Sequence, residues 1–235
     1  MQRLLQLVVL LPFLIPSAHF AVDDPKDTTP PDFRYRELQL EGWKVFVEQE
    51  LAAEADLCGE VERQLGVKLW EVRTRLPAEV VERLQAVPIR LHLDREGCPG
   101  GVYHPSADWL RQHDLPPDWA RGIEFGNARN FLSWSRAQPS MVLHELSHAW
   151  HHQVLDYGRK DVLAAFAAVR DAGTLDEVLY VTGGTQRAYA LNNEMEFFAE
   201  MSEAWWGTND FYPFVAAEVQ DAFPEVAGLM VACWK

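Results

Sequence analysis

The sequence predicts an α+β fold in which strands come first along the chain and helices follow. Its 235 residues are 48% hydrophobic and 24% charged, which is the composition of a globular protein with a substantial core. Hydrophobic and polar residues alternate in two short segments of the first 100 residues, as in half-buried strands. From Pro139 onward, hydrophobic residues recur every three or four positions, as on the buried side of a helix. We therefore expect a small mixed sheet followed by a helical C-terminal part.

Residues 1–21 are typical of a secretory signal peptide. Arg3 supplies a positive start, residues 4–15 are mostly apolar, and the small residues Ser17 and Ala18 follow. The segment is too short and too interrupted by proline to span a bilayer, which takes about 20 apolar residues. A buried N-terminal helix is the alternative. We expect a secreted or periplasmic protein, with no stable membrane insertion once the signal is removed.

A polar linker containing three prolines is expected over residues 22–34. The chain up to residue 100 then predicts a strand at 43–48, and hydrophobic residues at helical spacing predict a long helix over 57–76. Pro77 suits the first turn of a short helix that ends near residue 84. A second strand over 89–94 precedes a glycine-rich loop.

The chain after residue 100 is dominated by expected helices. A third strand region is predicted over 122–134. Four helical segments follow, at about 139–156, 160–171, 193–206 and 213–234.

The net charge makes nucleic acid an improbable partner. Thirty-five acidic residues stand against 21 basic ones, which gives −14 at pH 7. Phosphate contacts need a basic face, so we expect no nucleic-acid binding.

Three cysteines, Cys58, Cys98 and Cys233, are too few for a disulfide-stapled scaffold. In an exported protein they predict one disulfide and one leftover thiol. The sequence leaves the pairing open.

Residues 144–148, HELSH, form an H-E-x-x-H motif on the helix expected after Pro139. A four-residue step places two side chains about 40° apart on one helix face, so His144 and His148 can share one zinc ion. Glu145 stands beside them, where a carboxylate can take a proton from a metal-bound water. A core helix whose histidines are satisfied by hydrogen bonds is the alternative.

A catalytic zinc site needs a third protein ligand and leaves its fourth position for water. His151 lies on the same side of the helix, but about 10 Å from His144 along the axis, too far for both to hold one ion at about 2 Å. The metzincin arrangement is excluded, because His151 and Val154 occupy the places of its glycine and third histidine.

Glu196, Glu200 and Glu203 form one stripe on a downstream helix that is otherwise rich in aromatic residues. Like charges at this spacing repel one another, so we expect a cation or histidine partners to compensate them. A solvated acidic face is the alternative.

The HELSH motif and the segment YALNNEMEFFAE, residues 189–200, together resemble the active-site signature of the lethal-factor-type gluzincins, the clan that includes anthrax lethal factor. The segments YHPSADWL (103–110) and EFFAEMSEAWWGTNDFYPF (196–214) are similar to a group of uncharacterised secreted bacterial and fungal metallopeptidases. The resemblance covers roughly residues 100–235. It implies a zincin-like metallopeptidase domain over 35–235, with an N-terminal strand and helix part at 35–100 and a catalytic part at 101–235.

Carried over residue by residue, the resemblance implies that His144, His148 and Glu196 hold one zinc ion (Zn2+) per chain. Glu145 is then the general base that activates a zinc-bound water, and the reaction is hydrolysis of a peptide bond in a peptide or protein substrate. The sequence leaves the natural substrate, any propeptide and the oligomeric state open.

The resemblance implies two further roles. Tyr189, seven residues before Glu196, matches a tyrosine that supports the oxyanion. Glu200, one turn after Glu196, matches an acid that orients a ligating imidazole.

Two other interpretations stay open at this stage. Peptide deformylases pair a cysteine ligand in an EGC motif with a downstream HExxH, and residues 96–98 are Glu-Gly-Cys, which would make Cys98 the third ligand. Pro99 and Gly100 stand where that family has a Leu-Ser pair, and export argues against a cytosolic deformylase. The other interpretation is a secreted, non-catalytic module with a structural zinc, although such sites usually have four Cys or His ligands.

Overall fold

A computed structural model describes residues 33–235, and it confirms the α+β class with a small mixed sheet. The expected signal peptide over 1–21 and nearly all of the expected linker over 22–34 lie outside the described residues. None of the helices within residues 33–235 has the length and apolar character needed to cross a membrane.

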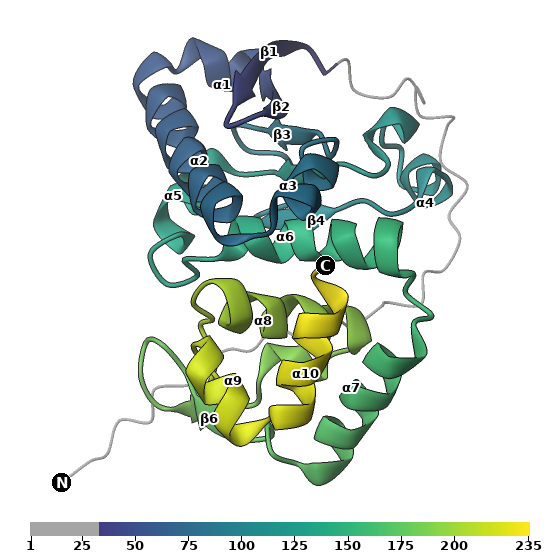
Figure 1. Ribbon diagram of the computed structural model, residues 1–235. Coiled ribbons are helices and arrows are strands. Elements are labelled where there is room, and N and C mark those ends of the chain that lie inside the picture. Colours follow the sequence, from purple (N-terminus) through teal and green to yellow (C-terminus); the bar gives the residue numbers. More distant parts are fainter. Residues whose placement is uncertain (1–32) are drawn as a thin grey trace, which may run out of the picture.

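A five-stranded mixed sheet organises the N-terminal half of the described chain (Figure 1). Its strand order is β1-β2-β3-β5-β4. The central strands β2, β3 and β5 run parallel, and the two edge strands are antiparallel to their neighbours. The strands are β1 (Tyr35–Leu40), β2 (Trp43–Glu48), β3 (Ile89–Leu91), β4 (Gly101–Tyr103) and β5 (Ile123–Phe125).

A tight turn at Glu41 and Gly42 joins β1 to β2. Both residues have positive φ, 51° and 97°, as type I′ hairpin turns require. Glycine is needed at the second position for space as well, because a Cβ there would lie 2.1 Å from the amide nitrogen of Gln85.

Helices cover the sheet and connect its strands. The long helix α2 carries a buried row of apolar residues at the spacing that the sequence predicted, and α3 begins directly after Pro77. The helices of this half are α1 (Gln49–Ala53), α2 (Ala55–Arg75), α3 (Ala78–Leu84), α4 (Ala107–Gln112) and α5 (Ala128–Trp134), with a 3-10 turn at Pro117–Trp119.

Helix α6, Met141–Trp150, runs across the middle of the molecule in Figure 1 and continues as a π-helical turn over His151–Leu155. The sheet with its helices lies on one side of α6, and the C-terminal helices lie on the other. Helix α6 packs against β4 of the sheet and against α8. The C-terminal elements are α7 (Lys160–Ala172), the hairpin β6 (Val178–Leu179) and β7 (Thr185–Gln186), a 3-10 turn (Tyr189–Leu191), α8 (Glu194–Trp206), α9 (Ala216–Ala222) and α10 (Pro224–Cys233).

Two expected elements are wrong in detail. The strand region expected over 122–134 is the three-residue strand β5 followed by helix α5, which starts where the Asn127 side chain accepts a hydrogen bond from the backbone N–H of Asn130. The helix expected over 213–234 is two helices, because Pro224 lacks the N–H that a continuous helix would use and instead occupies the first turn of α10.

The glycine-rich segment after β3 leads directly into β4, which begins at Gly101. Strands β4 and β5 complete the sheet that β1, β2 and β3 begin. The sheet therefore contains strands from both sides of the expected boundary between residues 100 and 101.

The expected disulfide is absent, because all three cysteines are free and buried. Cys58 lies in α2, Cys98 in the loop before β4, and Cys233 at the end of α10. These positions belong to different parts of the core, so each thiol packs separately. Burial raises the pKa of the Cys98 and Cys233 thiols to about 11, which makes them poor nucleophiles.

Candidate metal centre

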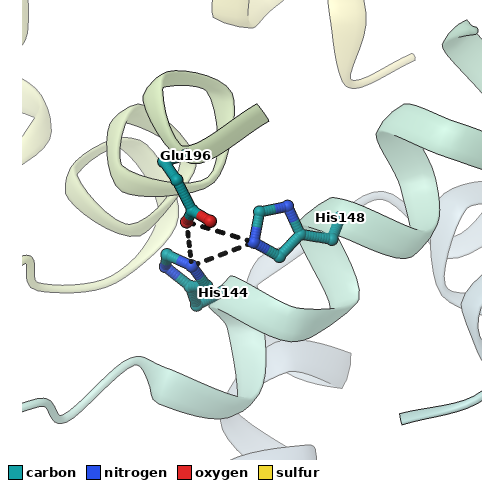
Figure 2. A group of neighbouring side chains, drawn as sticks. All are labelled: His144, His148 and Glu196. Atoms are coloured by element: carbon teal, nitrogen blue, oxygen red, sulfur yellow. Dashed lines mark hydrogen bonds and ion pairs between the residues drawn. The ribbon is translucent and has the colours of Figure 1, made fainter. Parts of the chain in front are cut away.

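Three side chains from α6 and α8 converge on one point, as Figure 2 shows. Nε2 of His144 lies 3.1 Å from Nε2 of His148 and 3.0 Å from Oε2 of Glu196. Nε2 of His148 lies 3.3 Å from the same Glu196 oxygen. Ligands about 2.0–2.1 Å from a tetrahedral zinc ion are about 3.3 Å apart, so the donor set suits zinc with little adjustment. The structure thus brings together all three predicted ligands.

Helix packing explains why these residues meet. The opposite side of α6 carries Val142, Leu146 and Ala149, all fully or almost fully buried. Helix α8 begins at Asn193, whose side chain accepts hydrogen bonds from the backbone N–H groups of residues 195 and 196. This cap places Glu196 in the first helical turn, where the helix dipole favours a carboxylate. Because α8 packs on α6, that turn faces the histidine pair.

The second nitrogen of His144 is held by an acid. Nδ1 of His144 donates a 2.7 Å hydrogen bond to Oε1 of Glu203, while Oε1 of Glu200 is 3.7 Å away. The orienting hydrogen bond expected from Glu200 therefore comes from Glu203, one turn further along α8. With Nδ1 occupied in this way, Nε2 of His144 is directed toward the ligand triangle.

The histidines and carboxylates stabilise one another's charge. Burial disfavours protonated His144, but its hydrogen bonds to Glu196 and Glu203 outweigh burial and raise its pKa well above the usual value. Burial also disfavours ionised Glu196, yet the hydrogen bonds to His144 and His148 outweigh it and lower the pKa of Glu196. A metal ion that bound here would replace the proton of His144, because only the neutral imidazole is a ligand.

Glu145 lies directly beneath strand β4. It is 8% exposed, and burial raises its pKa. A Cβ atom on Gly101 would lie 2.9 Å from Oε1 of Glu145 and 2.9 Å from the ring of Phe125. Only glycine therefore lets β4 pass so close to the carboxylate, a requirement that the sequence did not reveal.

Tyr189 stands on the 3-10 turn before α8, and its side chain borders the cleft. The residue is 46% exposed, and its ring centroid is 6.4 Å from that of His144. Partial burial raises its pKa above the usual value, so the phenol keeps its proton and can donate a hydrogen bond. Its role as an oxyanion donor stays a prediction.

Two hollows of about 330 and 280 Å³ meet at Gly101, His144, Glu145 and Tyr189. The larger hollow extends toward Glu200, Glu203 and Asp210. The smaller one extends past His148 and Glu196 toward Val102, Tyr103, Tyr157 and Met195. The converging residues are therefore reachable from a cleft that extends to both sides of them.

Cys98 is not part of this site. Within residues 33–235, two groups of His, Cys, Asp or Glu have donor atoms close enough for one metal ion: His144, His148 and Glu196, and His144, Glu200 and Glu203. Cys98 belongs to neither group, and its thiol lies 3.5 Å from the backbone carbonyl of Gly100. The deformylase-like arrangement is therefore not formed.

Sequence reasoning missed Asp210, which lies in the loop after α8 and reaches the larger hollow. No motif or spacing marks this aspartate. The loop is placed by tertiary contacts, including a 2.8 Å hydrogen bond from the backbone N–H of Val181 to the Asp210 carbonyl. The sequence did indicate Glu203, because it belongs to the acidic stripe of α8.

Comparisons of the chain with protein-family models, curated proteins and solved structures found no match. The chemistry of the site must therefore be argued from its residues. Two imidazoles, one carboxylate and an adjacent buried glutamate can hold a divalent cation and move a proton beside it.

Proposed function

We propose that the chain is a zinc-dependent metallopeptidase that hydrolyses peptide bonds. The observation that carries the proposal is the triangle of donor atoms on His144, His148 and Glu196, with Glu145 beside it at the junction of two hollows. Two His and one Glu are a ligand set of catalytic zinc, and they leave one position open. When bound, zinc acts as a Lewis acid and lowers the pKa of water to about 7.

Glu145 serves as the general base in this mechanism. Its carboxylate takes a proton from the attacking water and later returns a proton to the leaving amine. The raised pKa of the buried carboxyl suits this exchange, because a base whose pKa lies closer to the working pH both accepts and releases protons readily. The backbone of β4 above it limits the directions in which the carboxylate can turn.

Tyr189 donates a hydrogen bond to the carbonyl oxygen that gains negative charge during attack. Its raised pKa keeps it protonated at neutral pH, and its side chain lines both hollows.

Strand β4 offers a track for the substrate. It is an edge strand, paired on one side with β5, and it borders both hollows. An extended peptide could add to such an edge by backbone hydrogen bonds, which would hold it across the metal centre. We propose on these grounds a zincin-like catalytic fold, with an edge strand, the α6 motif helix and the ligand-bearing helix α8.

The predicted signal peptide supports a further part of the proposal, which is that the protein is exported and acts in the periplasm or outside the cell. Its substrate would then be an extracellular peptide or protein.

Hydrolysis of a fluorogenic peptide library by the zinc-loaded full chain tests the proposal. Glu145→Gln should keep zinc and lose at least about 10²-fold in rate, because general base catalysis typically contributes about 10²–10⁴-fold. Glu194→Gln, a change in the same α8 turn as Glu196 but outside both hollows, is the matched control and should keep full activity. Zinc binding without hydrolysis of any library peptide would instead favour a structural zinc.

A further inference from the structure

The larger hollow contains three buried carboxylates that do not bind the proposed zinc. Glu200, Glu203 and Asp210 are 3%, 3% and 2% exposed, and all three line the hollow. Each has one oxygen with no hydrogen-bond partner: Oε2 of Glu200, Oε2 of Glu203 and Oδ2 of Asp210. Leaving a buried carboxylate oxygen unpaired is costly, so these atoms need an explanation.

The neighbours of the three acids account for only one oxygen of each. His144 donates to Glu203, Asn209 donates to Glu200, and Gln138 donates to Asp210. None of the described residues that line the hollow is a lysine or an arginine. Among the described lining residues, His144 is therefore the one basic side chain near this group of carboxylates, and it contacts Glu203.

Apolar and aromatic side chains form part of the lining of the hollow. Trp134, Met141, Tyr180 and Phe211 line it together with the acids. A volume of about 330 Å³ is about ten times the share of one liquid water, so the hollow is far larger than a bare metal ion needs. A lining that combines aromatic side chains with carboxylates suits an aliphatic stem that carries a cation.

We propose that this hollow binds the basic side chain, arginine or lysine, of a substrate residue next to the scissile peptide bond. The carboxylates of Glu200, Glu203 and Asp210 line the hollow and accept hydrogen bonds from the guanidinium or ammonium group, and each still has one oxygen without another partner. Gly101, Glu145 and Tyr189 lie where the hollow meets the metal centre, so a residue seated there brings its own peptide bond to the site. This inference rests on the proposed peptidase function and names its substrate class.

Peptide binding to the zinc-loaded full chain, measured by calorimetry, tests the pocket without relying on turnover. The probes are pentapeptides in which a ketomethylene group replaces the scissile amide, with arginine, lysine or norleucine placed on either side of it. We expect the better arginine or lysine peptide to bind at least about tenfold more tightly than its norleucine counterpart, since only the basic side chain makes hydrogen bonds to the charged carboxylates. Equal binding of basic and norleucine peptides would overturn the inference.

Variants locate the binding site. Asp210→Asn should bring the ratio of arginine to norleucine affinity close to one, and Glu200→Gln should lower it, while circular dichroism checks that each variant is folded. Asp171→Asn is the matched control, because the Asp171 side chain is 69% exposed on α7, and it should keep the ratio of the unchanged chain. A ratio that survives both Asp210→Asn and Glu200→Gln in folded protein would overturn the inference.

Two further outcomes separate this inference from the proposed function. Tight binding of arginine peptides together with no hydrolysis of ordinary arginine peptides would support the pocket and contradict the peptidase. Hydrolysis with a preference for apolar residues on both sides of the bond would support the peptidase and overturn the pocket. A second zinc per chain that is lost in Asp210→Asn would assign the carboxylates to a metal ion and also overturn the inference.

Discussion

His151 is expected to make the stability of the fold depend on pH. Its side chain is fully buried, and neither ring nitrogen has a hydrogen-bond partner. The ring lies against Tyr157 and Phe198, with centroid distances of 4.9 and 4.7 Å. Burial is the main reason that the pKa of His151 falls from its usual 6.5 to about 4, and the positive charges of His148 and Arg159 lower it further.

The sign and size of the effect follow from proton linkage. Above pH 6.5 the imidazole is neutral in the folded and unfolded chains, so it adds no pH dependence. As the pH falls from 6.5 to about 4, His151 takes up a proton only in the unfolded chain, and the free energy of unfolding decreases. At about 1.4 kcal/mol per pKa unit, the lost stability approaches 3 kcal/mol, as an order of magnitude.

His151→Phe removes the titrating group and keeps a ring among the aromatic neighbours. Urea unfolding of both proteins between pH 7.5 and pH 4.5 measures the difference in free energy of unfolding, and other histidines that titrate in both proteins cancel. We expect this difference to shift in favour of the variant by about 2 kcal/mol across the range, since pH 4.5 lies just above the folded-state pKa. The exposed His113 provides the control, and His113→Phe should show no such shift. A difference between wild type and His151→Phe that does not change with pH would refute the reasoning.

Three further changes probe the site. Tyr189→Phe should lower the rate of peptide hydrolysis by about 10²–10³-fold with zinc content unchanged, and a normal rate would remove Tyr189 from its role as oxyanion donor. Glu203→Gln weakens the partner of His144 and should reduce zinc affinity by about 10–100-fold in chelator competition, whereas unchanged affinity would show that the hydrogen bond does not tune the ligand. Gly101→Ala places a methyl group against Glu145 and should cost about 10²-fold in rate with zinc retained, so full activity would mean that β4 can yield without moving the base.

Much of the fold could be predicted wherever one periodicity dominates a segment. Helices α2, α6, α7 and α8 follow the three- and four-residue spacing of their apolar residues, and β2 follows its alternation. Strand β1 escaped notice, since its pattern is mostly polar and it is held at the sheet edge by β2 and the turn at residues 41–42. Strand β4 escaped notice because its three residues follow a run of glycines and find their place only by pairing with β5.

Part of the candidate site could likewise be predicted from local sequence patterns, and part of it could not. Local spacing alone indicated His144 and His148, and a stripe on α8 indicated that its glutamates face a cation or histidines. Side-chain packing between α6 and α8 decides which glutamate contacts which nitrogen of His144. The hydrogen bond from Nδ1 of His144 is accepted by Glu203 and not by Glu200. Asp210 arrives from a loop fixed by tertiary hydrogen bonds, which no local pattern encodes.

The zinc content of the purified full chain, measured by elemental mass spectrometry, tests the central claim most directly. Wild type, Glu196→Ala and Cys98→Ser should be compared after dialysis against micromolar zinc. We expect one zinc per chain in wild type, its loss in Glu196→Ala and its retention in Cys98→Ser, because Cys98 lies outside the donor triangle. A wild-type chain that holds no zinc, or zinc that survives Glu196→Ala, would contradict the proposed metal centre.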